Sequence, residues 1–290
     1  MKSSRSVSYP SSFVLKTPAK INWFLSISGK RDDGYHNILS LMQCIDLYDE
    51  IIFAQADRLD LISDMDISPE ENLVCKAASA LGKRVSCDKG AKISLKKNIP
   101  SGAGLGGGSS DAACTLKGLN MLWELKLGSA ELFSIAAEIG SDVPFFLQGP
   151  CALIEGCGEI LKPLKVLSPT VLLLVKPSVS VSTAWAYAFY DSRLKLTKKP
   201  IDIKLLIQAL NRQDFASLDT LINNDLEYAV AERYPVIKDI KTRLMQSGAM
   251  LSAMTGSGSA VFGVFQNRKK AEKAANSMQS HWCKVVETLI

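Results

Sequence analysis

A glycine-rich segment that leads into a helix constrains this chain more than any other feature. Five of the seven residues in Gly102–Gly108 are glycine, so the backbone can bend freely there and approach a ligand closely. The next residues, Ser109–Leu125, place apolar side chains on one helical face. Because a helix N-terminus has unpaired N–H groups and a partial positive charge, this arrangement predicts a phosphate site. Ser109 and Ser110 are expected to cap the helix or to donate to the phosphate.

The glycines alone leave other kinds of loop open. Gly102, Gly104 and Gly107 fit the G-x-G-x-x-G pattern of a dinucleotide loop, but the region lacks the β-α-β context of that motif. A Walker A loop is excluded, because no lysine follows in the G-x-x-x-x-G-K-[ST] register. A flexible tight turn is the remaining alternative, although turns rarely need this much glycine before a well-patterned helix.

Length and composition limit the class of protein. The 290 residues suit one large domain or two ordinary ones, and 47% hydrophobic with 22% charged residues is typical of a globular protein. A net charge of +5 is too small to argue for nucleic acid but suits an anionic ligand. Seven cysteines without a C-x-x-C pair, with only two histidines, argue against a zinc site or a disulfide framework. We therefore expect a cytoplasmic protein with reduced thiols.

Two features bear on targeting. No apolar run reaches the roughly 18 residues of a membrane span, so no membrane partner is expected. The segment Met1–Ser12 is basic and serine-rich but lacks the apolar core of a signal peptide. A ragged N-terminal extension is favoured over a short transit segment.

The order of predicted elements favours an α+β fold over a doubly wound sheet, because strands and helices do not alternate regularly. The segment Pro163–Pro169 is expected to divide the chain. Strands are predicted at Phe13–Lys16, Ile21–Ser28, Glu50–Ala54, Ala91–Lys97, Val171–Lys176, Ala260–Phe265 and Lys284–Thr288. Besides Ser109–Leu125, helices are predicted at Asn72–Leu81, Ser129–Ile139, Ile203–Leu210, Ala216–Glu227, Val236–Ser247 and Arg268–Gln279, with Gly140 as a C-cap.

Three further segments are ordinary when taken singly. Lys20 lies in P-A-K-I-N beside a strand, Asp142 lies in G-S-D-V-P after a helix, and Thr255–Ser259 is a second loop of small residues. A lone lysine is usually solvated, a lone aspartate usually forms a turn, and such a loop could be a hairpin turn. Together with the first loop they supply a cation, a carboxylate and a second backbone wall, which are the parts of phosphoryl transfer.

These segments, in this order, resemble the GHMP kinase superfamily. That family carries P-x-x-x-G-L-G-S-S-A-A as its phosphate loop, a lysine-containing N-terminal strand and a C-terminal glycine loop. The resemblance covers Lys16 to about Phe265, nearly the whole chain. Within the superfamily, the chain resembles one branch in particular. The segments that carry this closer resemblance are G-K-R-D-D-G-Y-H (Gly29–His36), G-L-G-G-G-S-S-D-A-A and T-G-S-G-S-A-V-F. That branch phosphorylates the 2-hydroxyl of a CDP-linked sugar alcohol in the non-mevalonate isoprenoid pathway.

The resemblance implies a two-domain α+β GHMP kinase fold with its active site in the inter-domain cleft. Residues 1–165 would form an N-terminal nucleotide- and substrate-binding domain, similar to domain 2 of ribosomal protein S5. Residues 166–290 would form the C-terminal GHMP kinase domain.

The resemblance also assigns the chemistry. Asp142 would be the catalytic base, with Lys20 beside it to keep the carboxylate ionised and to stabilise the phosphoryl group. ATP and Mg²⁺ would be the cofactors, although no acidic Mg²⁺ ligand is obvious outside Asp142. The cofactor-binding residues would be Pro100, Ser101, Gly102, Ala103, Gly104, Leu105, Gly106, Gly107, Gly108, Ser109 and Ser110, with Lys97 as a further candidate. Two departures from the family pattern are Ala103, where glycine is frequent, and Ser141, where alanine is frequent.

For the substrate, Tyr35 would stack on the cytosine and His36 would hydrogen-bond to it. A flat base has two faces to cover, and either Tyr187 or Trp185 would supply the second aromatic. The substrate-binding residues would be Asn22, Tyr35, His36, Thr183, Tyr187, Gly256 and Gly258.

Three rival functions remain at this point. Another GHMP kinase, such as a mevalonate or homoserine kinase, would not need the Gly34–His36 segment. A catalytically silent ligand sensor on the same fold would not need both Lys20 and Asp142. A dinucleotide-binding oxidoreductase would need its glycine loop inside a parallel β-α-β unit. The oligomeric state is open between a monomer and a weak dimer.

Overall fold

The computed structural model describes residues 12–63, 68, 70–87, 89–193 and 201–290. Helices and strands follow one another in mixed order, which confirms the predicted α+β class. The chain forms two compact units, each assembled from separate stretches of sequence. Unit 1 draws its described residues from Met1–Thr17, Tyr48–Asn98 and Gly107–Leu147, and unit 2 draws its own from Pro18–Leu47, Ile99–Gly106 and Gln148–Ile290. The predicted division after residue 165 concerns sequence-continuous domains and stays a prediction.

Unit 1 contains a sheet built around β4 (Ala91–Lys96). This strand pairs antiparallel with Glu50–Ala54, the end of β2 (His36–Ala54), and parallel with β3 (Leu59–Ser63). The alternating burial of β4 agrees with the predicted strand, in which every second side chain enters the core.

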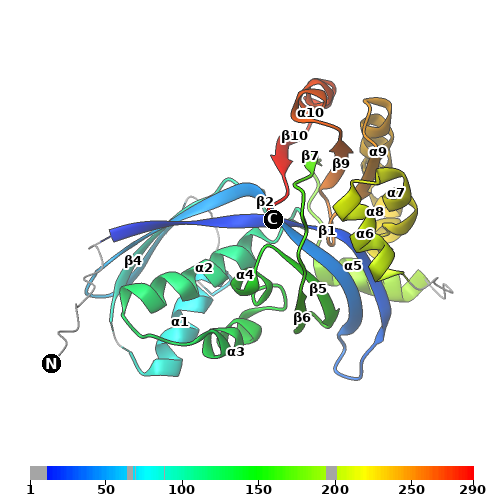
Figure 1. The fold of residues 1–290 in the computed structure, drawn as a ribbon. Helices are drawn as coiled ribbons and strands as arrows, with labels where there is room; N and C mark the ends of the chain where they lie inside the picture. Colours follow the sequence, from blue (N-terminus) through cyan, green and yellow to red (C-terminus); the bar gives the residue numbers. More distant parts are fainter. Residues whose placement is uncertain (1–11, 64–67, 69, 88, 194–200) are drawn as a thin grey trace. The chain divides into compact units, whose positions relative to one another are not determined.

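The helices of unit 1 pack against one another and against this sheet (Figure 1). A Cβ on Gly118 would lie 2.3 Å from the ring of Phe53, so glycine lets α2 approach β2 closely. Asn72 caps α1, because its side chain accepts a hydrogen bond from the N–H of Val74. The helices are α1 (Leu73–Val85), α2 (Gly107–Leu122), α3 (Ser129–Ile139) and α4 (Phe145–Gln148).

Unit 2 begins with the remainder of β1 (Ser12–Lys30), which pairs with β2. Residues 38–43 of β2 pair antiparallel with β5 (Cys151–Gly156), which in turn pairs with β6 (Ile160–Pro163). The prediction of two separate strands, Phe13–Lys16 and Ile21–Ser28, is wrong, because β1 continues through Pro18 between them. Among the described strands β1 pairs with β2 alone, and an edge strand tolerates a proline that cannot donate to the ladder.

A second sheet of unit 2 is antiparallel throughout, with β7 (Val171–Lys176) near its centre. Leu172 and Leu174 face one core, which also contains Trp23 of β1, while Leu173 and Val175 face another. Both faces of β7 are therefore covered, which agrees with the continuous apolar run of its sequence. The strand order is β10 (Trp282–Glu287), β7, β9 (Val261–Phe265) and β8 (Leu251–Met254).

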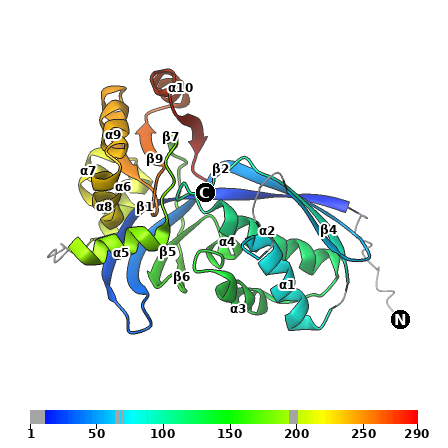
Figure 2. The same ribbon diagram turned by 180° about the vertical axis from the view of Figure 1, so that it is seen from behind.

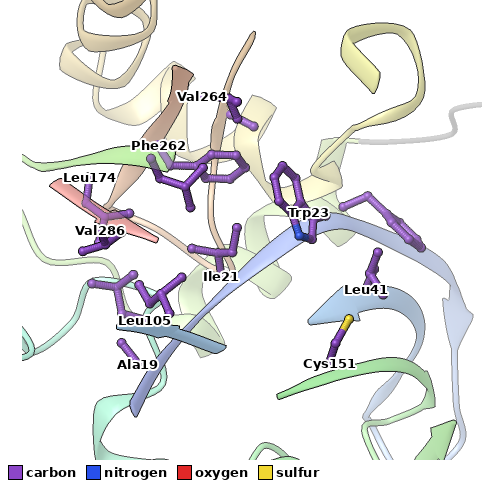
Figure 3. Packing of buried hydrophobic residues seen from close by; sticks show 14 of the residues in the cluster. Ala19, Ile21, Trp23, Leu41, Leu105, Cys151, Leu174, Phe262, Val264 and Val286 are labelled. Carbon is purple, nitrogen blue, oxygen red and sulfur yellow. The ribbon is translucent and has the colours of Figure 1, made fainter. Parts of the chain in front are cut away.

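The first of these cores packs β1 against the four-stranded sheet (Figure 3). The rings of Trp23 and Phe262 meet edge to face, with centroids 5.7 Å apart. Ala19 and Ile21 are completely buried in the same cluster. Because side chains alternate along a strand, Lys20 and Asn22 leave β1 on the opposite side from these apolar residues.

Helices cover the rest of unit 2. Figure 2 shows α9 and α10 beside the four-stranded sheet, which agrees with their contacts to β8, β9, β7 and β10. The helices are α5 (Thr183–Arg193), α6 (Ile203–Arg212), α7 (Phe215–Leu221), α8 (Asp225–Arg233), α9 (Val236–Gln246) and α10 (Arg268–Ala275). Within the described part of the chain, no helix is both long and apolar enough to cross a membrane. All seven cysteines lie in described residues, and none of them forms a disulfide.

One segment that was predicted as a single helix forms two helices. The segment Ala216–Glu227 is divided between α7 and α8, because α7 ends at Leu221 and Asn224 starts a new helix. The Asn224 side chain accepts a hydrogen bond from the N–H of Leu226, as an N-cap residue does.

Candidate active site

The first glycine loop, Ile99–Gly106, turns at its glycines and is anchored by the residues between them. The side chains of Ala103 and Leu105 are buried in the core of unit 2. The chain then enters α2 at Gly107, where the first backbone N–H groups have no partner within the helix. Donors and an adaptable backbone of this kind fit the phosphates of a nucleotide. The loop glycines with φ of 60°, 73° and 70° are Gly102, Gly104 and Gly106.

The second glycine loop, Thr255–Ser259, lies directly against the first loop within unit 2. The N–H of Ala260 donates to the carbonyl of Ala103 at 3.1 Å. A Cβ on Gly104 would lie 2.2 Å from the carbonyl oxygen of Thr255, and one on Gly256 would lie 2.9 Å from that of Gly104. Glycine is thus required at both positions for the two backbones to touch. The structure brings the two predicted loops together, and their ligands stay predictions.

Lys20 and Asn22 lie beside this pair of loops and are almost completely buried. Lys20 Nζ donates to Asn22 Oδ1 at 2.6 Å, and Asn22 Nδ2 donates to Ser40 Oγ at 2.8 Å. The backbone N–H of Asn22 donates to Thr255 Oγ1 at 2.9 Å. A Cβ on Gly256 would lie 3.2 Å from Lys20 Nζ, so the ammonium group is at the second glycine loop. A cation fixed in this way can neutralise a phosphoryl group without reorganising.

Three further residues hold Lys20, Asn22 and the second glycine loop in place, and no sequence pattern predicted this role for them. They are Ser40, Thr255 as a hydrogen-bond acceptor, and Asn224. Asn224 Nδ2 donates to the carbonyls of Met254 and Gly256 at 2.9 and 2.8 Å, which ties the second glycine loop to the start of α8. Each is a single polar residue far along the chain from its partner, so no local pattern marks it.

Tyr35 and His36 lie at the turn between β1 and β2. Gly34 has a φ of 86°, which the turn requires and glycine allows. The Tyr35 side chain is exposed, whereas His36 is buried. The ring of Tyr187 stacks on that of His36, with centroids 4.9 Å apart and planes 26° apart. Tyr187 is therefore in place beside His36, and its contact with a base stays a prediction.

The rival aromatic, Trp185, packs elsewhere. Its ring contacts Phe189 at 5.3 Å and Tyr234 at 6.0 Å between centroids. This difference follows from the helix, because residues two apart on α5 point in different directions. The geometry favours Tyr187 over Trp185 as the aromatic next to His36.

Asp191 joins this cluster and was also missed. Its Oδ1 accepts from His36 Nε2 at 2.6 Å, and its Oδ2 accepts from Lys30 Nζ at 2.6 Å. Desolvation raises the pKa of Asp191, but the hydrogen bonds from Lys30 and His36 outweigh it, so the pKa is lowered. Asp191 follows Tyr187 by four residues on α5, so both side chains share one face of the helix. That spacing is the signal by which the sequence could have revealed it.

Thr183, the first residue of α5, contacts the second glycine loop. Its hydroxyl lies 2.8 Å from that of Ser257. The substrate role predicted for Thr183 is not tested by this contact and stays a prediction.

Asp142 lies in unit 1, in the turn between α3 and α4. Gly140 ends α3 as predicted, and its N–H donates to the carbonyl of Ala136. Lys20 belongs to unit 2, and its predicted pairing with Asp142 stays a prediction.

Ser109 and Ser110 differ in their surroundings at the start of α2. Ser110 is buried, and its hydroxyl accepts a hydrogen bond from that of Thr17. Ser109 is partly exposed, so it is the better placed of the two to reach a ligand.

Lys97 lies in a buried charge cluster of unit 1, with Asp49 and Asp111. Its ammonium group donates to a carboxylate oxygen of each aspartate, at 2.7 Å in the case of Asp111. Burial lowers the pKa of Lys97, but the two carboxylates outweigh it and the pKa is raised. Burial raises the pKa of Asp111 to about 7, because the neighbouring Lys97 only partly offsets the cost of burying a charged carboxylate. Among the described residues, Asp111 Oδ1 is the buried side-chain oxygen without a hydrogen-bond partner.

The raised pKa of Asp111 predicts a pH-dependent stability. The unfolded chain loses this proton near pH 4, whereas the folded protein keeps it to about pH 7. Because the folded state binds more protons in between, the free energy of unfolding should fall as the pH rises from 4 to 7, by up to about 1.4 kcal/mol per pH unit. Urea denaturation of the wild type and of Asp111→Asn at pH 5 and 7 measures this. The variant should lose this part of the slope, whereas exposed Asp57→Asn should keep it. Equal slopes in wild type and Asp111→Asn would show that Asp111 is ionised throughout.

No group of three or more histidine, cysteine, aspartate or glutamate side chains gathers in a metal-binding arrangement among the described residues. Mg²⁺ commonly keeps several waters and binds through one or two carboxylates plus substrate phosphates. The residues present therefore fit a magnesium ion that enters with nucleotide phosphates, rather than one held in a protein cage.

Comparison with known families agrees with this site. The N-terminal domain model of the GHMP kinases matches residues 72–150, which include the whole first glycine loop, α2 and Asp142. The C-terminal domain model of the same family matches residues 206–283, which include the second glycine loop. Together the fold and the two matches define a GHMP kinase.

Individual relatives indicate a particular family within the GHMP kinases. A 4-diphosphocytidyl-2-C-methyl-D-erythritol kinase of Thermodesulfovibrio yellowstonii is 48% identical over 95% of this chain and 97% of its own. A crystal structure of 4-(cytidine 5'-diphospho)-2C-methyl-D-erythritol kinase matches 94% of this chain and 99% of its own, with a TM-score of 0.82 and 32% identity. The chain belongs to the GHMP kinases, in the family of the 4-diphosphocytidyl-2-C-methyl-D-erythritol kinases. Homoserine kinase from Cytophaga hutchinsonii shares the fold, with a TM-score of 0.75 over 99% of this chain and 98% of its own, at 19% identity.

Proposed function

We propose that this chain transfers the γ-phosphoryl group of ATP to the 2-hydroxyl of 4-diphosphocytidyl-2-C-methyl-D-erythritol. The products are the 2-phosphate and ADP, and the reaction belongs to the non-mevalonate (MEP) pathway of isoprenoid biosynthesis. The family and the relatives named above support the reaction class.

The observation that carries the substrate assignment is the cluster at the turn between β1 and β2. Tyr35 offers an exposed ring, Tyr187 offers a second ring that stacks on His36, and His36 offers a hydrogen-bonding group. Aromatic rings of this kind stack on a base, and an imidazole reads its polar edge. An acceptor without a base, such as homoserine, would make no use of these residues.

The nucleotide half of the site follows from the glycines. The first glycine loop and the start of α2 offer backbone N–H groups to the ATP phosphates, and Ser109 adds a hydroxyl. Mg²⁺ would accompany these phosphates and would neutralise charge on them. The backbone donors serve to orient the phosphates and to exclude freely moving water.

The chemical step rests on two side chains. Asp142 would accept the proton of the substrate hydroxyl as general base. Lys20 would stabilise the charge that develops on the transferred group, and its hydrogen bond to Asn22 fixes the ammonium group in advance. This division of labour also argues against a silent sensor, which would need neither group.

Acceptor selectivity tests this function. Purified protein with ATP and Mg²⁺ should release ADP when 4-diphosphocytidyl-2-C-methyl-D-erythritol is added, and not when homoserine or mevalonate replaces it. A coupled assay of ADP measures the rates. Faster turnover of either alternative acceptor would overturn the substrate assignment, and no turnover of any acceptor would favour the sensor.

Removing the exposed ring should weaken substrate binding selectively. Tyr35→Ala should raise the KM for the CDP-linked substrate by roughly 5- to 150-fold, because base stacking on an aromatic contributes about 1–3 kcal/mol. The KM for ATP should stay within about twofold. Steady-state kinetics with each substrate varied in turn gives both values.

A matched variant shows whether the effect is local. Tyr228 of α8 is also exposed, and Tyr228→Ala should leave both KM values unchanged. If Tyr35→Ala raised both KM values equally, Tyr35 would not contact the cytosine.

A further inference from the structure

The hydrogen bond between His36 and Asp191 fixes which ring nitrogen of His36 carries a proton. Asp191 accepts from His36 on one oxygen and from Lys30 on the other, each at 2.6 Å. An ionised carboxylate has no proton to donate. His36 Nε2 must therefore carry the hydrogen, and in the neutral ring Nδ1 is left as an acceptor.

The other ring nitrogen is open to a ligand. Among the described residues, His36 Nδ1 has no hydrogen-bond partner. Asp111 Oδ1 also lacks a partner but is fully buried, whereas His36 Nδ1 is not. Nδ1 therefore keeps some contact with solvent, although the side chain as a whole is 7% exposed. Stacking on Tyr187 and the bond to Asp191 together restrict rotation of the ring.

Cytosine and uracil differ in the group that such a nitrogen could meet. Cytosine presents an exocyclic amine, which is a donor, whereas uracil presents a carbonyl oxygen at that position, which is an acceptor. An acceptor nitrogen therefore attracts cytosine and repels uracil. With the opposite tautomer, the preference would be reversed.

We propose that Asp191 is a positioning residue that sets the base specificity of the site, by holding His36 in the Nε2–H tautomer with Nδ1 free to accept from cytosine. This inference rests on the proposed function, because it assumes that His36 faces the base of the substrate. It adds a residue on α5 that touches no substrate and acts through His36.

Lys30 determines how the amide side chain would be oriented in Asp191→Asn. In Asp191→Asn the amide oxygen should turn toward the Lys30 ammonium group, which can only donate. The amide nitrogen then faces His36 and, as a donor, requires Nε2 to accept. The proton moves to Nδ1, which now repels the cytosine amine and suits the uracil oxygen.

Binding of CDP and UDP tests this directly by calorimetry. The wild type should bind CDP more tightly than UDP, and Asp191→Asn should reduce that preference by roughly tenfold or more. Asp219→Asn, at an exposed position of α7, should keep the wild-type ratio. In Lys30→Met/Asp191→Asn the amide is free to turn back, so part of the CDP preference should return. Equal ratios in the single and double variants would contradict the orienting role of Lys30.

A spectroscopic measurement reports the tautomer of His36 separately from any effect of the substitution on folding. The chain has two histidines, so ¹⁵N spectra of the ring nitrogens can be assigned with His281→Gln as reference. The His36 signals should show Nε2–H in the wild type and Nδ1–H in Asp191→Asn. An Nδ1–H tautomer in the wild type would overturn the proposal even if the variant were poorly folded.

The binding results show whether the proposed substrate or only the role of Asp191 is wrong. If the wild type does not distinguish CDP from UDP, the proposed substrate is wrong and the inference falls with it. If the wild type prefers CDP and Asp191→Asn keeps the same ratio, the inference alone is wrong.

Discussion

Asp142→Asn is expected to lower kcat by roughly 10²–10⁴-fold, the usual contribution of a general base. The amide has nearly the shape of the carboxylate but cannot take up the proton of the substrate hydroxyl. Nucleotide affinity should change little, since the phosphates are assigned to backbone donors of the first glycine loop and α2. Steady-state kinetics and calorimetry with ATP measure the two effects separately.

The control for this variant is another aspartate of unit 1. Asp60 of β3 is exposed, and Asp60→Asn should turn over substrate at the wild-type rate. Wild-type kcat in Asp142→Asn would show that a different group removes the proton. A loss of ATP binding equal to the loss of kcat would instead give Asp142 a part in holding the nucleotide.

Gly104→Ala is expected to have the second large effect, on stability as well as on activity. Gly104 has a φ of 73°, where an L side chain costs about 1–3 kcal/mol, and the added Cβ would lie 2.2 Å from the carbonyl oxygen of Thr255. Since that oxygen belongs to the backbone, the two glycine loops must separate to admit the methyl group. We expect a loss of at least about 3 kcal/mol in the free energy of unfolding, and a weakened affinity for ATP.

Thermal denaturation and the free energy from urea titration test this change. For 290 residues, a loss of this size corresponds to a drop in Tm of about 5 °C or more. Gly29→Ala is the matched control, because nothing lies within 4 Å of its Cβ position and its φ is not positive. If Gly104→Ala were as stable as Gly29→Ala, the described contact between the loops would be wrong.

Local patterns predicted those elements whose signals are contained within one segment. The helix Ser129–Ile139 was predicted to the residue, because Gly140 marks its end and the apolar positions follow a helical period. The helix after the first glycine loop was predicted from the same kind of evidence. By contrast, α5 escaped notice, since apolar residues occupy nearly every position of its first two turns and do not form one stripe.

Other elements could not be predicted because their stability comes from distant partners. Residues 38–43 of β2 are held by β5, more than a hundred residues later in the chain. Continuation of β1 through Pro18 depends on its place at a sheet edge, which no local pattern reveals. In the site, the motifs located Lys20, Asn22 and the two loops, whose proximity within unit 2 the structure then showed. Ser40, Asn224 and Asp191 are single residues that acquire their roles only through folding.

The central claim, phosphorylation of the 2-hydroxyl of a CDP-linked sugar alcohol, is tested most directly by phosphorus NMR. Purified protein, ATP, Mg²⁺ and 4-diphosphocytidyl-2-C-methyl-D-erythritol should give a new phosphomonoester signal, together with the two signals of ADP. The diphosphate signals of the substrate should persist in the product, and Asp142→Asn should give no new signal in the same time. ADP formation without a phosphomonoester, or no change in the spectrum, would contradict the account.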